Sequence, residues 1–218
     1  MLPAASLLIF DCDGVLVDSE PISHAVLRDL LAEHGVRLNM EQMYARFMGA
    51  TMDQVLQICG ELLDAPVPEG FLAEHRARTF RAFEADLAPV AGITQLLDSL
   101  PMPYCVASNG PHAKMRCTLG VTGLLARFED RIFSADDVHH AKPAPDLFLL
   151  AARSMSVSAA DCVVIDDSPV GIQAARAAGM RALGFAAMMP AERLQAAGAH
   201  NVFRSMDELP ALLRLQQR

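Results

Sequence analysis

The chain has 218 residues, of which 52% are hydrophobic and 20% charged, and its formal net charge is -8 at pH 7. This apolar content excludes an intrinsically disordered chain and indicates a packed aliphatic core. The acidic balance argues against binding to nucleic acid or to anionic membrane surfaces, because both need a basic footprint. The length suffices for one sizeable core and a smaller subdomain.

The first predicted element is a buried strand over residues 7–10, where four apolar residues precede an aspartate. A long stretch follows, from residue 21 to residue 83, with helical punctuation and little strand character. Glycines and a Pro-Val-Pro turn divide this stretch into four predicted helices. These helices span residues 23–31, 40–47, 52–63 and 69–83.

Beyond residue 89 the pattern alternates between short apolar runs and helical segments. The predicted helices span residues 93–100, 112–119, 145–155, 169–178 and 206–215. The predicted strands span residues 104–107, 131–133, 162–165 and, as the last strand, 181–185. Such alternation implies right-handed crossovers between parallel strands. We therefore predict an α/β fold, with a doubly wound, Rossmann-like parallel-sheet core (residues 1–17 and 87–218) and an inserted α-helical cap subdomain (residues 18–86).

The cysteines, at positions 12, 59, 105, 117 and 162, lack the spacing of a metal or redox pair. Their odd number in apolar surroundings indicates reduced thiols, so we expect a cytoplasmic protein. Residues 1–10 are apolar without a basic start, and they are too short for a secretory or membrane-spanning segment. No later run approaches spanning length, so no membrane partner is expected.

Two aspartates, Asp11 and Asp13, come directly after the first predicted strand. Side chains alternate between the faces of an extended chain, so both carboxylates project to one side and Cys12 to the other. Two like charges would be crowded there unless a cation, or the chemistry of an anionic substrate, required both carboxylates at that place. We therefore interpret the pair as a site and Cys12 as a packed thiol. A turn with an N-capping carboxylate is the local alternative.

Other polar residues follow the later predicted strands. Residues 108–110 come after the second strand, Lys142 lies in the loop after the third, and residues 166–168 come after the fourth. Ligands bind beyond the carboxyl ends of the strands in such sheets, so these residues are expected to converge. Carboxylates suit Mg²⁺, whereas a lysine and backbone N–H groups suit phosphate. Local alternatives exist, because Ser168 before Pro169 is a good helix N-cap and an isolated lysine is commonly solvated.

Four sequence runs, DCDGVLVDS, VASNG, KPAPD and VVIDDSPVGIQAARAAG, resemble the ordered motifs of the haloacid dehalogenase superfamily. The resemblance implies a phosphohydrolase in which Asp11 is the nucleophile that forms an aspartyl-phosphate and Asp13 is the general acid and base. The implied phosphoryl-binding residues are Ser108 and Lys142. The implied Mg²⁺ ligands are Asp11, Asp13 through its backbone carbonyl, Asp166 and Asp167.

The helical insertion resembles the cap of the beta-phosphoglucomutase-like branch, which covers the site and selects substrates. The runs DCDGVLVDSEPIS and SNGPHAKM are similar to those of bacterial 6-phosphogluconate phosphatases. The resemblance therefore implies Mg²⁺-dependent hydrolysis of a small phosphorylated sugar or sugar acid, with 6-phosphogluconate among the expected substrates. The implied substrate-binding residues are Gly49, Asn109, Lys114 and Arg76.

A phosphosugar mutase of the beta-phosphoglucomutase type is the second enzymatic interpretation. Two departures weigh against it, because Met52 stands where the mutase carries a phosphate-binding arginine and Ser23 where it carries a histidine. A non-catalytic phosphometabolite-binding or partner-binding protein is the alternative from another class. We expect a monomer or weak dimer. Five of the seven histidines, at positions 24, 75, 112, 139 and 140, are interpreted as surface or capping residues rather than metal ligands.

Overall fold

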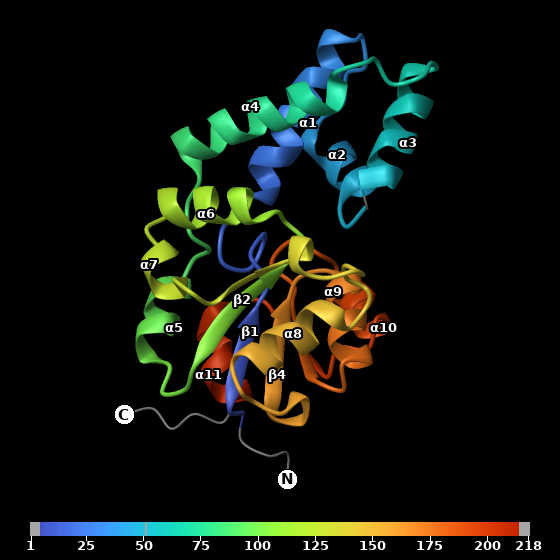
Figure 1. Ribbon diagram of the computed structural model, residues 1–218. Helices are drawn as coiled ribbons and strands as arrows, with labels where there is room; N and C mark the ends of the chain where they lie inside the picture. The colour runs from blue at the N-terminus through green and yellow to red at the C-terminus, as the bar shows by residue number, and fades with distance from the viewer. Residues whose placement is uncertain (1–4, 51, 214–218) are drawn as a thin grey trace. The chain divides into compact units, whose positions relative to one another are not determined.

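The computed structural model describes residues 5–50 and 52–213, and within this range the chain forms two compact units (Figure 1). The core unit combines the segment that ends at Asp18 with the segment that begins at Ala88. The helical unit runs between them as Ser19–Leu87. None of the described helices is both long and apolar enough to cross a membrane.

The core unit is built on a parallel sheet with the strand order β3-β2-β1-β4-β5-β6. The strands are β1 Leu7–Phe10, β2 Tyr104–Ser108, β3 Ile132–Ser134, β4 Cys162–Asp166, β5 Arg181–Phe185 and β6 Asn201–Phe203. Strand β1 lies in the middle, with Ile9 in register with Cys105 of β2 and Val164 of β4. All four residues of β1 are buried, as expected for a strand covered on both faces.

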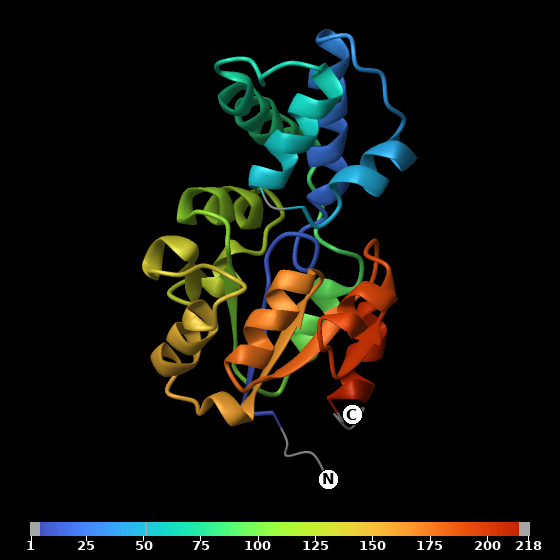
Figure 2. The ribbon, with the colours of Figure 1, turned by 90° about the vertical axis from the view of Figure 1, so that its right-hand side faces the viewer.

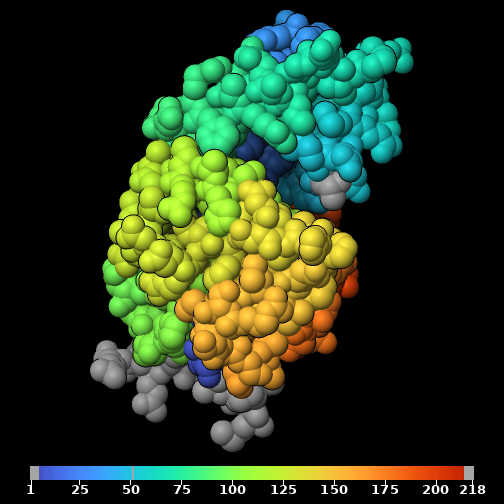
Figure 3. All heavy atoms as spheres, in the orientation of Figure 1, coloured from blue at the N-terminus to red at the C-terminus, as the bar shows by residue number. Residues whose placement is uncertain are grey.

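Helices cover both faces of this sheet. They are α5 Ile93–Ser99, α6 His112–Val121, α7 Leu125–Phe128, α8 Asp146–Ser154, α9 Pro169–Ala177, α10 Ala191–Ala196 and α11 Leu209–Leu212. Short 3₁₀ turns add η1 Ala135–Asp137, η2 Ala159–Asp161 and η3 Met206–Glu208. Figure 1 shows α8 in front of the strands and α11 behind them. In Figure 3 the side chains of α6, α7 and α8 hide the strands on the visible face of this unit.

The predicted α/β class with a parallel sheet is confirmed, and β1 has the predicted bounds. The helices α7 and α10, the strand β6 and the 3₁₀ turns η1 and η2 were not predicted. The prediction that residues 181–185 form the last strand is therefore wrong, because Asn201–Phe203 pairs with β5 beyond it. The predicted helix over 206–215 divides into η3 and α11, which contains a proline in its first turn, and its final residues lie outside the described range.

The helical unit consists of α1 Glu20–Glu33, α2 Met40–Phe47, α3 Met52–Leu63 and α4 Phe71–Asp86. Its helices α1 and α4 pack against each other (Figure 2). Its own apolar core includes Leu27, Leu31, Met43, Phe47, Cys59 and Phe71. Asn39 starts α2 with a reciprocal capping box to Gln42, which explains why that helix begins where the sequence predicts.

Candidate active site

Three neighbouring strands of the core unit end in polar side chains. Asp11 follows β1, Ser108 is the last residue of β2, and Asp166 is the last residue of β4. All three are buried. The backbone N–H of Asp11 donates to the carbonyl of Ile165 at 2.9 Å, so the chain is still tied to β4 at this point. The parallel topology therefore brings side chains that are distant in sequence to one edge of the sheet, as the motif pattern predicts.

The ammonium of Lys142 bridges two of these carboxylates. Its Nζ lies 2.5 Å from Asp11 Oδ1 and 2.8 Å from Asp166 Oδ2, and its side chain is only 3% exposed. Nζ also lies 4.7 Å from the centroid of the Phe148 ring. The alternative reading of Lys142 as a solvated surface lysine is therefore wrong, because its charge is buried and paired.

Burial and charge set the protonation of this group. Burial raises the pKa of Asp11 to about 7, against the opposing effect of Lys142, and the charge of Asp166 adds to the rise. Burial alone would lower the pKa of Lys142, but the two carboxylates raise it above the ordinary value, so the lysine keeps its proton. Two carboxylates thus share one buried ammonium, and their mutual repulsion together with burial favours the protonated form of Asp11.

Asp166 is held from both sides. Its Oδ1 accepts hydrogen bonds from the backbone N–H of Ser168 at 2.9 Å and from the Ser168 hydroxyl at 2.7 Å, while Oδ2 accepts from Lys142. The Ser168 oxygen also caps α9 by accepting from Gly171 N–H at 3.0 Å. The helix-cap interpretation of Ser168 is therefore confirmed, and the same side chain also binds the Asp166 carboxylate.

Gly171 gives this carboxylate its space. A Cβ atom at Gly171 would lie 1.8 Å from Asp166 Oδ2, far closer than any real contact. The glycine in the first turn of α9 is thus explained by the carboxylate that packs against it. The sequence analysis placed Ser168 among the converging residues but missed Gly171 as a support of the site, although a glycine so near a helix start was a visible signal.

Asp13 and Ser108 meet around Gly110. A Cβ atom at Gly110 would lie 3.7 Å from each of three atoms, namely Asp13 Oδ2, Ser108 Oγ and Lys114 Cδ. The Lys114 ammonium donates to Asp13 Oδ2 at 2.8 Å, and both side chains are partly exposed. The side chain of Asp13 and the hydroxyl of Ser108 therefore both lie next to Gly110, and Asp13 has Lys114 as its ion-pair partner.

Asp167 lies against the turn that follows Asp13. Gly14 has a φ of +72°, and a Cβ atom there would lie 2.1 Å from Asp167 Oδ2. The absence of a side chain at Gly14 therefore lets this carboxylate approach the backbone next to the Asp13 carbonyl. Within residues 5–50 and 52–213, no three His, Cys, Asp or Glu side chains form a metal-binding cluster. Any cation here would need backbone or ligand oxygens to complete its shell.

Asn109 is engaged with the protein backbone. Its Nδ2 donates to the carbonyl of Lys142 at 3.2 Å, and its Oδ1 accepts from the N–H of Lys142 at 3.0 Å. The same loop is held by Ser134, whose hydroxyl donates to the Gly110 carbonyl at 2.8 Å. The sequence analysis predicted that Asn109 binds the substrate. A local sequence pattern could not predict its contacts with a backbone 33 residues away.

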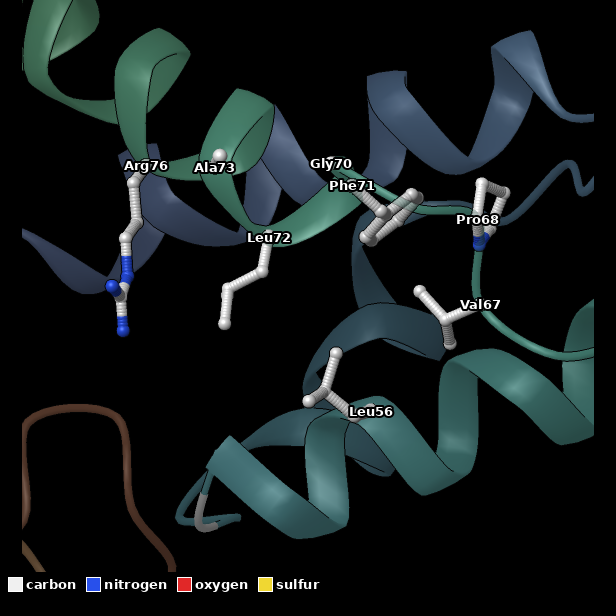
Figure 4. Close-up of a pocket in the computed structure, with 8 residues that line it drawn as sticks. All are labelled: Leu56, Val67, Pro68, Gly70, Phe71, Leu72, Ala73 and Arg76. Carbon is white, nitrogen blue, oxygen red and sulfur yellow. The ribbon is translucent and has the colours of Figure 1, made fainter.

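The other two predicted substrate-binding residues belong to the helical unit. Gly49 follows α2 with a φ of +73°. Arg76 lies on α4 and lines an open pocket of 460 Å³ together with apolar side chains (Figure 4). Those side chains include Leu56, Val67, Phe71 and Leu72. In Figure 4 the guanidinium of Arg76 extends away from α4 at one end of this pocket.

The reading of His24 as a surface or capping residue is wrong in part, because the side chain is buried. Its Nδ1 lies 2.8 Å from the Glu20 carbonyl oxygen, and its ring packs edge-on against Tyr44. The interpretation of Cys12 as a packed thiol agrees with its burial near the Thr118 hydroxyl. Burial and the charges of Asp13 and Asp11 raise the pKa of Cys12, which keeps it protonated.

A family profile of haloacid dehalogenase-like hydrolases matches residues 5–179 of the chain. The chain belongs to this family. This hydrolase is 36% identical over 182 residues to 6-phosphogluconate phosphatase of Escherichia coli, covering 83% of this chain and 82% of the relative. It is 35% identical to fructose-1-phosphate phosphatase YqaB of the same organism, covering 81% and 94% of the two chains.

Solved structures agree with this assignment. A conserved haloacid dehalogenase-like protein from Agrobacterium tumefaciens superimposes with a TM-score of 0.90 at 37% identity, covering 96% of this chain and 98% of the other. A putative beta-phosphoglucomutase from Thermotoga maritima superimposes with a TM-score of 0.80 at 26% identity, covering 97% and 100%. The predicted family and the predicted phosphatase class of the enzyme are confirmed.

Proposed function

We propose that this hydrolase is a Mg²⁺-dependent phosphatase of small phosphorylated sugars or sugar acids, acting through an aspartyl-phosphate on Asp11. The observation that carries the proposal is the buried Lys142 ammonium between Asp11 and Asp166. A buried cation beside a carboxylate nucleophile can bind a phosphoryl group and offset the charge repulsion between the two anions. Ser108 supplies a hydroxyl at the neighbouring strand end.

The chemistry divides into two displacements at phosphorus. Lys142 occupies Oδ1 of Asp11, so we assign the attack on phosphorus to Oδ2. The bond from phosphorus to the sugar oxygen breaks as Asp13 donates a proton to that oxygen. Asp13, now ionised, takes a proton from a water molecule, whose oxygen attacks phosphorus and displaces Asp11. The products are the sugar and inorganic phosphate, and both aspartates return to their starting states.

The oxygen atoms at this edge of the sheet fit Mg²⁺ as it is bound in sites that process phosphate. Such sites hold the ion by one or two carboxylates and leave the other positions to water and substrate phosphate, so a cluster of three side chains is not required. Both oxygens of Asp166 accept hydrogen bonds from protein donors. Among the described residues, the Asp166 carboxylate accepts three such bonds whereas that of Asp11 accepts one, from Lys142, so Asp11, Asp167 and the Asp13 carbonyl would hold the ion and Asp166 would have a positioning role. When bound, Mg²⁺ would neutralise charge on the transferring phosphoryl group.

The names of the relatives and the pocket of the helical unit support the proposed substrate class. Both E. coli relatives carry the names of sugar or sugar-acid phosphatases. Arg76, on an otherwise apolar pocket wall, offers a cation for the carboxylate or hydroxyl groups of such a ligand. We propose that the helical unit acts as the substrate-selecting cap and that Gly49, Lys114 and Arg76 contribute to selection.

The deciding experiment is phosphate release from a panel of phosphorylated sugars and sugar acids, including 6-phosphogluconate and fructose 1-phosphate, with and without Mg²⁺. We expect Mg²⁺-dependent release with a marked preference within the panel. Asp11→Asn serves as the control, because it keeps the shape of the side chain without its nucleophilic oxygen. Conversion of a sugar phosphate to its isomer without phosphate release would support the mutase. The absence of both reactions would support a binding protein.

A further inference from the structure

Lys142 lies in the loop between η1 and α8, outside any helix or strand. Its residue is buried, so its backbone N–H and carbonyl need hydrogen-bond partners. Within the described part of the chain, both hydrogen bonds of the Lys142 main chain are made with the side chain of Asn109, 33 residues earlier. The position of the lysine in its loop therefore depends on one amide.

The two bonds are reciprocal, which makes the contact directional. The amide of Asn109 donates to the Lys142 carbonyl and accepts from the Lys142 N–H, as two paired residues do in an antiparallel sheet. A flipped amide would set donor against donor and acceptor against acceptor, so only one orientation satisfies both atoms. An aspartate would lose the donor, and an alanine would lose both bonds.

We propose that Asn109 is a positioning residue for the phosphoryl-transfer reaction, which fixes the Lys142 ammonium between Asp11 and Asp166 by holding the Lys142 main chain. Asn109 follows Ser108 directly, so its amide also ties the hydroxyl at the end of β2 to the lysine. The inference rests on the proposed phosphatase function and replaces the substrate-binding role that sequence reasoning gave to Asn109. Misplacement of a catalytic group by about 1 Å can cost on the order of 10²-fold in rate.

The test compares substrates that differ only in their leaving groups. Wild type, Asn109→Ala and Asn109→Ser are assayed with Mg²⁺ on acetyl phosphate, p-nitrophenyl phosphate and the preferred sugar phosphate. We expect kcat to fall by the same factor, about 10-fold or more, on all three substrates, with KM changed less than kcat. Asn201→Ala, on the exposed start of β6, is the matched control and should leave both parameters unchanged.

A second comparison uses the lysine itself. In a Lys142→Ala background, Asn109→Ala should cause little further loss, because the group that it positions is gone. A loss of kcat confined to the sugar phosphate, or a rise in KM alone, would indicate that Asn109 binds the substrate and would overturn the inference. Additive losses in the double variant would overturn it as well. An inactive wild type would instead count against the proposed function. Because Asn109 is exposed outside these two bonds, both variants are expected to fold, which a denaturation curve checks.

Discussion

Replacement of Gly171 by alanine would test how tightly the site is packed against α9. A Cβ atom at this position falls 1.8 Å from Asp166 Oδ2 and 2.0 Å from its Cγ, whereas real Cβ contacts below 3.0 Å are essentially unknown. The carboxylate must therefore move by about 1 Å or more, because the helix backbone cannot retreat from β4 without losing its own packing. Such a shift breaks the 2.8 Å contact between Asp166 and Lys142.

The magnitude follows from two opposing contributions. Glycine to alanine in an unobstructed helix stabilises a protein by up to about 1 kcal/mol. Disrupting a buried ion pair costs about 3–5 kcal/mol when one charge is left unpaired, and Lys142 keeps Asp11 as a partner, so we place the loss at the lower end. The expected net effect of Gly171→Ala is a loss of about 2 kcal/mol in the free energy of unfolding, with kcat reduced by at least about 10-fold.

The assays are urea unfolding and phosphate release, and the control is Gly120→Ala in α6 of the same unit. A Cβ atom at Gly120 meets only Leu125 Cδ2 at 4.0 Å, so this variant should gain up to about 1 kcal/mol and keep its activity. If Gly171→Ala matched Gly120→Ala in stability and turnover, the packing argument would be refuted.

Three further predictions concern the charges of the site. Asp11→Asn should abolish turnover yet stabilise the metal-free protein. The pKa of Asp11 is raised from 3.8 to about 7 in the folded state, so the stability that its protonated form contributes is present below pH 3.8 and is lost as the pH rises to 7. In urea unfolding, the gain in free energy of unfolding of the variant over wild type should therefore grow over that window to at most about 4 kcal/mol and then level off. Gly14→Ala should abolish the rise in melting temperature that Mg²⁺ causes in the wild type, because the new methyl group displaces Asp167 and a φ of +72° disfavours alanine. An unchanged Mg²⁺-induced shift of the melting temperature would contradict the assignment of Asp167 as a Mg²⁺ ligand. Lys114→Met should lower kcat on sugar phosphates, because Asp13 loses its ion-pair partner, and unchanged steady-state kinetics would show that the pair is not used in turnover.

The sequence predicted the elements that are both apolar and bounded by clear turn residues. Strand β1 and helices α2 and α3 have the bounds that the pattern predicts. Strand β6 was not predicted because it has only three residues, of which Asn201 is exposed. It therefore shows neither an apolar run nor a full alternation of apolar and polar residues. Helix α10 was missed for a similar reason, since six residues after Pro190 are too few for a 3.6-residue period to be visible.

The residues of the site could be found from the order of motifs at strand ends, but their pairings could not. Lys114 pairs with Asp13 over 101 positions, and Asn109 holds Lys142 over 33 positions. Such contacts depend on the register of neighbouring parallel strands, which local patterns do not specify. The sequence therefore predicted which residues gather, whereas the structure shows which of them hold the others in place.

The central claim is that Asp11 carries the phosphoryl group between the two displacements. The most direct measurement uses Asp13→Asn with acetyl phosphate and Mg²⁺, because acetyl phosphate needs no acid to expel its leaving group, whereas attack by water needs the Asp13 base. Acid quenching followed by peptide mass spectrometry should find phosphorylated Asp11 in near-stoichiometric amount, and none in Asp11→Asn. Phosphorylation of another residue, or turnover by Asp11→Asn at the wild-type rate, would contradict the account.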